Sequence, residues 1–190
     1  IKYRKYTKEQ TLSMEKFDVI VVGAGTAGCM AAKTVAKAGL KTCLIDRKRK
    51  EDIGEKICGD AVGTHHFDDL GLEYPKGEEL ASKVSGVKIY SPDMQTVFKI
   101  KSERFYGLIL NRRLFGQRLL RQAIDQGATL FDCTHVVDPI LQDGFVAGVS
   151  IRNVKTESKT PLRAKVVVDA SGYTAVLRSK LPPEMGIERN

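Results

Sequence analysis

DVIVVGAGTAGC, residues 18–29, decides the fold of this chain. Its first part, Val19–Val22, is an uninterrupted β-branched run, which is typical of a strand buried on both faces. Its second part has the glycine spacing G-x-G-x-x-G, formed by Gly23, Gly25 and Gly28. The stretch therefore predicts a central strand that ends in a tight turn and opens a helix.

The residues after the glycines complete a strand–helix–strand unit. Good helix formers fill 26–38, and Gly39 stands where a C-cap glycine belongs. Residues 41–45 predict a second strand that ends at Asp46, 18 residues after Gly28. We therefore expect an α/β fold with a Rossmann-like βαβ start.

Each part of this unit has a chemical reason. Gly23 permits the tight turn, Gly25 lets the backbone approach a pyrophosphate, and Gly28 lets the helix lie close to the strand. Free N–H groups and the positive end of the helix dipole favour phosphate. Asp46 can accept hydrogen bonds from a ribose and disfavours a 2′-phosphate, so the pattern favours FAD over NADP or FMN. The alternative is a glycine-rich turn that serves packing only.

Composition is that of an ordinary globular domain. The chain has 190 residues, of which 42% are hydrophobic and 28% charged. No apolar run approaches the roughly 18 residues that a membrane helix needs. The first 13 residues are polar and basic, lack a signal-peptide core and precede Met14, a plausible native start, so residues 1–15 stand apart from the domain. We expect them to be an extension or tag-like tail outside the fold.

Cysteine spacing and charge narrow the classes of partner. The cysteines and histidines form neither C-x-x-C nor a zinc pattern, so we expect no metal and a reduced cytoplasmic setting.

The net charge is +8, with basic clusters at 2–8, at 47–50 and at 112–121. These clusters are either solvated surface or a contact with an anionic surface, such as membrane headgroups or phosphorylated substrates. Nucleic acid is disfavoured because aromatic residues do not interleave the basic runs.

The rest of the chain alternates short strands with helices. Glycine-punctuated loops and turns surround a short helix at 64–70, and Asn111 is a suitable N-cap for a helix to about Gln126. The strand predictions are a hairpin over 84–100, a strand at 106–110, a strand at 129–137, a hairpin turning at Asp143-Gly144, and a short buried strand at 166–169. The βαβ start is thus followed by an inserted β-hairpin and a β-meander.

This order of parts resembles the flavin-dependent group of aromatic hydroxylases and geranylgeranyl reductases, and especially the archaeal geranylgeranyl reductase family. Three stretches carry the resemblance: the glycine turn with Asp46, the sequence EKICGDA at 55–61, and VDASGYTAVLR at 168–178. Arg112 with Phe115 also matches that family, although Gly116 replaces an acid there.

The resemblance implies FAD as the cofactor. It places cofactor contacts at two sets of positions. The glycine turn and its neighbours contribute Gly23, Gly25, Ala27, Gly28, Asp46 and Arg47. Positions further along the chain contribute Cys58, Gly59, Asp60, Ala61, Arg112, Val136, Asp169 and Gly172. Cys58 is also the one candidate for a catalytic role, and the sequence indicates no other and names no electron donor. Cys58 could equally be a small packing residue.

The implied activity is reduction of isolated double bonds in isoprenoid chains of membrane lipids. With such a substrate, the basic clusters would make peripheral contact with an anionic membrane surface. The alternatives are another flavoenzyme of the group, a monooxygenase or electron-transfer dehydrogenase, or a non-catalytic nucleotide-binding module. Such reductases are roughly twice this length, about two domains. We therefore expect 16–181 to be the N-terminal part of the FAD-binding domain. The substrate domain would belong to a missing C-terminal half, so the chain alone should bind FAD weakly.

Overall fold

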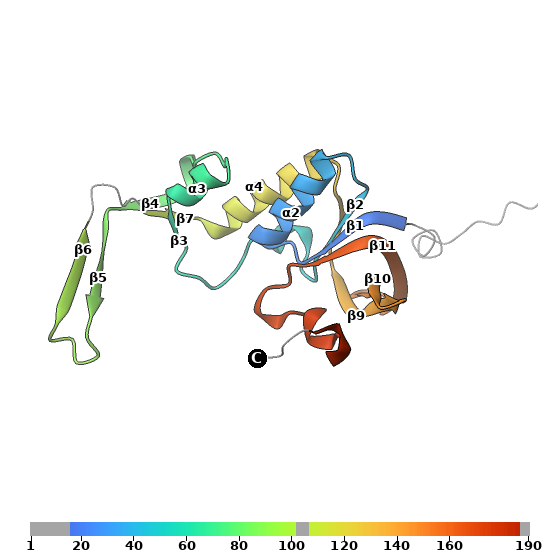
Figure 1. The fold of residues 1–190 in the computed structure, drawn as a ribbon. Helices are drawn as coiled ribbons and strands as arrows, with labels where there is room; N and C mark the ends of the chain where they lie inside the picture. Colours follow the sequence, from blue (N-terminus) through green and yellow to red (C-terminus); the bar gives the residue numbers. More distant parts are fainter. Residues whose placement is uncertain (1–15, 102–106, 187–190) are drawn as a thin grey trace, which may run out of the picture. The chain divides into compact units, whose positions relative to one another are not determined.

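A computed structural model describes residues 16–101 and 107–186, drawn in Figure 1. The predicted tail at 1–15, with its basic cluster at 2–8, and Tyr106 of a predicted strand lie outside the described residues. The chain divides into two compact units. Unit 1 contains the described residues up to Gly54 and from Gly116 onward, and unit 2 contains those between Glu55 and Phe115.

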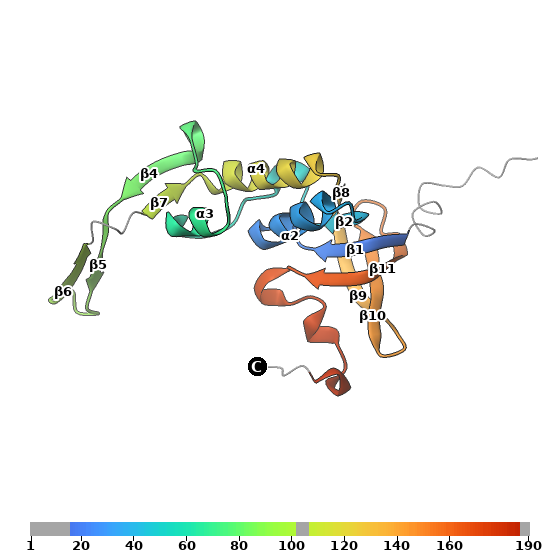
Figure 2. The ribbon, with the colours of Figure 1, turned by 45° about the horizontal axis from the view of Figure 1, so that its top comes forward.

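Unit 1 is built on a six-stranded sheet with the order β8-β2-β1-β11-β10-β9, visible in Figure 2. The strands are β1 (Lys16–Val22), β2 (Thr42–Ile45), β8 (Thr129–Phe131), β9 (Thr134–Gln142), β10 (Phe145–Asn153) and β11 (Lys159–Asp169). Strands β8, β2, β1 and β11 are parallel, whereas β10 and β9 continue the sheet antiparallel. The predicted α/β class, βαβ start and meander are confirmed.

The predicted βαβ unit forms with nearly the expected bounds. Helix α2 (Thr26–Lys37) leads from β1 to β2 and packs against both strands. Gly39 has φ +80°, the left-handed conformation that ends a helix at a glycine. Val21 in β1 and Leu44 in β2 are fully buried, as expected for central parallel strands.

Helix α4 (Arg112–Asp125) begins where Asn111 was predicted to cap it. The Asn111 Oδ1 accepts a 3.2 Å hydrogen bond from the backbone N–H of Leu114. Its predicted apolar face is buried, and Leu120 and Ala123 have no exposed surface. A 2.9 Å hydrogen bond from the Lys33 ammonium to the Gln122 side chain joins α2 to this helix.

Two strand predictions are corrected. The single strand expected at 129–137 is divided between β8 and β9, because Cys133 adopts φ +47° and its N–H donates to the Lys48 carbonyl. The short strand expected at 166–169 is the end of β11, which starts at Lys159 and carries Pro161 inside it. It is also less buried than predicted, since Val166 is 52% exposed.

Unit 2 holds two small sheets. One has the order β3-β7-β4, from β3 (Ala61–Gly63), β4 (Leu80–Val84) and β7 (Gly107–Leu110). The other is the predicted hairpin, β5 (Gly86–Tyr90) with β6 (Val97–Lys101). Helix α3 (His65–Asp69) confirms the short helix, whereas β3 and β4 were not predicted because both are short and lack an apolar run.

In the part of the chain that the structure describes, the elements are completed by the 3-10 turns η1 (Lys50–Asp52), η2 (Gly77–Glu79), η3 (Gly172–Thr174), η4 (Arg178–Lys180) and η5 (Pro183–Met185). The main core cluster of unit 1 includes Ile20, Ile45, Val149 and Leu162. Among the described residues, no helix is both long and apolar enough to cross a membrane.

Candidate cofactor site

Two glycines of the turn after β1 are required by the fold itself. Gly23 has φ +97°, and a Cβ on it would lie 2.6 Å from the carbonyl oxygen of Ala170. A Cβ on Gly28 would overlap the carbonyl oxygen of Gly23. These two positions therefore bring β1, the start of α2 and the end of β11 into close contact.

Gly25 has no such structural reason to be glycine. Its backbone has φ −71° and ψ −175°, which any residue adopts, and a Cβ there would meet nothing within 4 Å. It is exposed, as are the two residues that follow it, Thr26 and Ala27. The missing side chain therefore leaves the backbone accessible from outside, which suits a pyrophosphate lying against the turn.

The N-terminus of α2 is electrostatically suited to an anion. Gly25 is its N-cap, no side chain caps it, and its first turn contains no acid. The N–H groups and dipole of this 12-residue helix therefore favour negative charge at this end.

Asp46 is held at the end of β2 by two backbone donors. The N–H of Ala24 donates to its Oδ2 at 2.7 Å, and the N–H of Lys48 donates to its Oδ1 at 2.8 Å. A carboxylate offers about four acceptor positions. The two oxygens are thus oriented and can still accept hydrogen bonds from ribose hydroxyls. Arg47, the next residue, is exposed.

The turn after β11 is organised by Asp169. Its Oδ1 accepts a 2.5 Å hydrogen bond from the Ser171 hydroxyl, and its Oδ2 accepts from the N–H groups of Leu177 and Arg178 at 2.9 and 3.0 Å. Burial alone would raise the pKa of Asp169, but these hydrogen bonds outweigh it and lower the pKa. Gly172 has φ +79° in the same turn.

Segment 46–54 is fixed against the start of α4 within unit 1. The Gln117 side chain donates to the carbonyl oxygens of Lys50 and Ile53, both at 2.7 Å. A Cβ on Gly116 would overlap the Cα of Gly54. Gly116 stands where the resembled family has an acid. An acidic side chain would not fit at this position in this chain.

A second cluster of predicted residues lies within unit 2. The Arg112 Nη2 donates to the Cys58 Sγ at 3.4 Å, and its Nε lies 3.4 Å from Oδ1 of Asp60. A hydrogen bond from the Asp60 backbone and one from Arg112 lower the pKa of the Cys58 thiol. Because Cys58 is exposed as well, it has the environment of a reactive cysteine.

The other thiols are less reactive or less accessible. Cys29 is buried against the carbonyl oxygen of Ala24, and burial together with the charge of Asp46 raises its pKa to about 12. Cys43 is fully buried and Cys133 is partly buried. Within 16–101 and 107–186, no group of three His, Cys, Asp or Glu residues could hold a metal ion.

The structure brings most of the predicted cofactor-binding residues of unit 1 together. For the other predicted residues, contact with FAD stays a prediction. The glycine turn, Asp46 and the Asp169 turn meet where β1, β2 and β11 end, which is where open α/β sheets bind ligands. Val136 lies in β9 and packs against the core, so its contact with FAD stays a prediction. The same holds for Cys58, Gly59, Asp60, Ala61 and Arg112, which are grouped in unit 2.

Sequence reasoning missed three residues that shape this site. Ala24 orients Asp46, Ser171 orients Asp169, and Gln117 holds segment 50–53. Ser171 could have been found, because a serine two residues after an acid commonly closes a local turn. The contacts of Ala24 and Gln117 span 22 and at least 64 positions and leave no local signal.

Comparison with known proteins places the chain among flavoproteins. The model of the FAD-binding domain family matches residues 16–190. A digeranylgeranylglycerophospholipid reductase of Sulfolobus acidocaldarius is 48% identical over 172 residues, which cover 90% of this chain and 37% of the relative. A digeranylgeranylglycerophospholipid reductase of Methanopyrus kandleri is 32% identical, over 83% of this chain and 38% of its own length.

Solved structures show the same fold. A geranylgeranyl bacteriochlorophyll reductase-like protein of Thermoplasma acidophilum aligns with a TM-score of 0.78 and 30% identity, covering 87% of this chain and 41% of that one. A myxobacterial FAD-dependent halogenase aligns with a TM-score of 0.68 and 21% identity, over 87% of this chain and 39% of its own, a likeness of fold alone. The chain spans about two fifths of the length of these proteins.

Proposed function

This chain belongs to the FAD-binding domain family, and on that premise we propose that it is the cofactor-binding part of a FAD-dependent reductase. The reductase would saturate isolated double bonds in the isoprenoid chains of membrane lipids. FAD, the cofactor predicted from the sequence, is confirmed by the family match.

One structural observation, at Gly25, gives the main support for the proposal. Gly25 is glycine although neither its backbone conformation nor its packing requires it. It opens a helix with no acid in the first turn, and beside it an aspartate is already oriented. A diphosphate at the helix and a ribose at the aspartate account for all three features.

The residues of unit 1 would hold and orient the cofactor rather than react with substrate. The backbone from Gly25 to Ala27 would donate N–H groups to the pyrophosphate, and Asp46 would accept from the ribose. The Asp169 turn would stand beside the glycine turn and keep its shape. When bound and reduced, FAD supplies the hydride that a double-bond reduction needs.

The substrate class rests on the relatives. The two archaeal relatives carry the name digeranylgeranylglycerophospholipid reductase, and this supports a phospholipid with isoprenoid chains as the substrate. We propose that the substrate is bound by a part of the polypeptide that corresponds to the remaining length of those relatives. Cys58, with its lowered pKa, is the candidate for a residue near the reaction.

The cellular setting follows from the substrate. A phospholipid substrate lies in a membrane, and the chain carries a net charge of +8. We therefore propose that the protein works in the cytoplasm and makes peripheral contact with an anionic membrane surface.

A chimera tests the activity. Residues 16–186 would replace the matching part of the Sulfolobus acidocaldarius relative, and the product would be loaded with FAD and reduced with dithionite. Incubation with a digeranylgeranyl glycerophospholipid should give products heavier by two hydrogens per reduced double bond in mass spectrometry. A chimera that binds FAD but yields hydroxylated or unchanged lipid would overturn the proposal. The same chimera with Asp46→Ala is the control for dependence on the cofactor.

A further inference from the structure

The β5–β6 ribbon of unit 2 exposes one apolar face. Residues directly opposite each other in an antiparallel pair share a face. The register places Val87 opposite Ile100 and Ile89 opposite Phe98. These four side chains are 46%, 54%, 49% and 61% exposed, respectively. Four large apolar side chains therefore form a continuous patch that no described residue covers.

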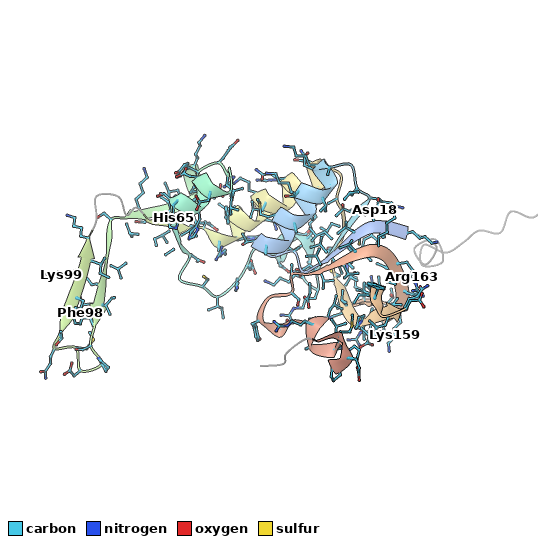
Figure 3. All side chains as sticks on the ribbon, in the orientation of Figure 1. Asp18, His65, Phe98, Lys99, Lys159 and Arg163 are labelled. Carbon is cyan, nitrogen blue, oxygen red and sulfur yellow. The ribbon has the colours of Figure 1, made fainter. Side chains whose placement is uncertain are left out.

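The other face of the ribbon carries three lysines, together with Tyr90 opposite Val97 at the end next to the turn. Lys88 lies directly opposite Lys99, and Lys101 lies on the same face opposite Gly86. Like charges in directly opposite positions destabilise a hairpin. Neither strand contains an acid, and within the described residues none of the three ammonium groups lies in an ion pair. Figure 3 labels Phe98 and Lys99, neighbours in β6 that belong to opposite faces.

We propose that the β5–β6 ribbon is the surface by which this protein contacts an anionic phospholipid membrane. This inference rests on the proposed function, which places the substrate in such a membrane. The apolar face would enter the boundary between headgroups and acyl chains, as in amphipathic elements that lie in the interface. The long lysine stems would reach around the narrow ribbon so that their ammonium groups meet lipid phosphates.

The turn of the ribbon sets its orientation. Asp93 accepts hydrogen bonds from the Ser91 hydroxyl and the Gln95 N–H, which lower its pKa and keep it ionised. An ionised carboxylate is repelled by anionic lipid and costly to bury. The ribbon would therefore lie along the surface with its turn in water, rather than enter by its tip.

Charge favours a lipid surface over a polypeptide as the occupant. A second copy of this chain packed against the apolar face would leave the repulsion between Lys88 and Lys99 in place, whereas lipid phosphates would neutralise this pair. A covering polypeptide would have to use the apolar face or the open strand edges. These two occupants are the competing outcomes of the test.

The test measures how the chain of residues 1–190 sediments with vesicles. One set is phosphatidylcholine, and the other holds equal amounts of phosphatidylcholine and phosphatidylglycerol. Neither contains isoprenoid lipid or FAD, so the result does not depend on reductase activity. The chain should prefer the anionic vesicles, and added salt should weaken that binding.

Variants locate the contact. Lys88→Glu with Lys99→Glu should lower the affinity for anionic vesicles at least about tenfold. Ile89→Ser with Phe98→Ser should lower it by a similar factor. Lys88→Gln with Lys99→Gln removes the two charges without reversing them, so it should lower the affinity for anionic vesicles less. It tests the same contact with a change that is less disruptive to folding.

Two sets of controls in unit 1 match these variants. Lys155→Glu with Lys159→Glu makes the same change of charge, and Phe145→Ser removes a side chain that is 74% exposed. Both control variants should keep the affinity for anionic vesicles within about twofold of that of the parent chain, far less than the tenfold loss expected of the ribbon variants. Equal binding to both kinds of vesicle, or equal losses in the controls, would overturn the proposal. So would ribbon variants that keep vesicle binding but lose self-association in sedimentation, since a second copy would then be the occupant.

Discussion

The backbone N–H of Ala24 donates a 2.7 Å hydrogen bond to Oδ2 of Asp46, across 22 positions of sequence. Ala24 stands between the first two glycines of the turn, and Asp46 ends the neighbouring strand. The same carboxylate therefore fixes the glycine turn and faces the position predicted for the ribose. In the proposed site, the shape of the turn and the recognition of adenosine would therefore depend on one side chain.

Asp46→Ala should weaken FAD binding and lower stability together. Charge-assisted hydrogen bonds to the ribose are worth about 1.5 to 3 kcal/mol, so the FAD dissociation constant should rise about ten- to a hundredfold. Loss of the hydrogen bonds that Asp46 accepts from the N–H groups of Ala24 and Lys48 should also lower the free energy of unfolding by about 1 to 3 kcal/mol. Isothermal titration with FAD and urea unfolding measure the two effects.

Asp18→Ala is the matched control for that variant. Asp18 also accepts a backbone hydrogen bond, from Lys41, and pairs with Lys165 at 2.8 Å, but it has no predicted role at the cofactor. Figure 3 labels it on β1. Its loss should change stability and leave FAD affinity as it is. If both variants lose FAD affinity equally, the adenosine end has been placed wrongly.

Gly25→Ala and Gly28→Ala should separate ligand binding from folding. At Gly25 the new methyl group meets nothing, so stability should stay within about 1 kcal/mol of the parent. FAD affinity should nevertheless fall, because the methyl group occupies space reserved for the pyrophosphate. At Gly28 the methyl group overlaps the Gly23 carbonyl, so the fold itself should be destabilised. Thermal unfolding without FAD and titration with FAD distinguish the two; unchanged FAD affinity in Gly25→Ala would contradict the proposed site.

Local sequence signals predicted the part of the fold that carries the glycine turn and Asp46. The β-branched run, the glycine spacing and the caps at Gly39 and Asn111 depend on residues close in sequence, and the structure has them where expected. The division of the 129–137 strand could not be predicted in this way. It depends on the hydrogen bond from Cys133 to Lys48, which links residues 85 positions apart.

Pairing with neighbouring strands explains the other differences between the predicted and the observed strands. Pro161 argues against a strand interior, yet it lies inside β11 opposite Ser150 of β10. Strand β4 has alternating weakly apolar residues, and its pairing with β7 defines it rather than its own composition. At the site, the sequence predicted Asp46 and Asp169 as cofactor contacts, and that role stays a prediction. The backbone donors that hold both side chains depend on tertiary structure and were not predicted.

Cys58 should react with iodoacetamide faster than an ordinary thiol at neutral pH. The backbone of Asp60 and the Arg112 guanidinium lower its pKa, so more of it is thiolate. Arg112→Gln should shift the pH dependence of alkylation upward, without restoring the ordinary value, because the backbone hydrogen bond remains. Mass spectrometry of alkylated peptides gives the rate at each pH. Cys29, buried and with a pKa raised to about 12, is the internal control that should stay unmodified in the folded chain. Equal rates for Cys58 in the parent and the variant would show that Arg112 does not act on the thiol.

Asp169 should make unfolding of the chain sensitive to acid. Its hydrogen bonds from Ser171, Leu177 and Arg178 lower its pKa in the folded state. A lowered folded-state pKa means that its contribution to stability is complete above the unfolded value of about 3.9 and is lost as the pH falls through the folded value. Asp169→Asn should therefore be less stable than the parent at pH 7, and the difference between them should shrink below about pH 4. Urea unfolding across this pH range measures the difference, with Asp138→Asn as the control, since the Asp138 carboxylate lies in an exposed pair with Lys180. A constant difference at every pH would mean that Asp169 stabilises its turn by shape and not by charge.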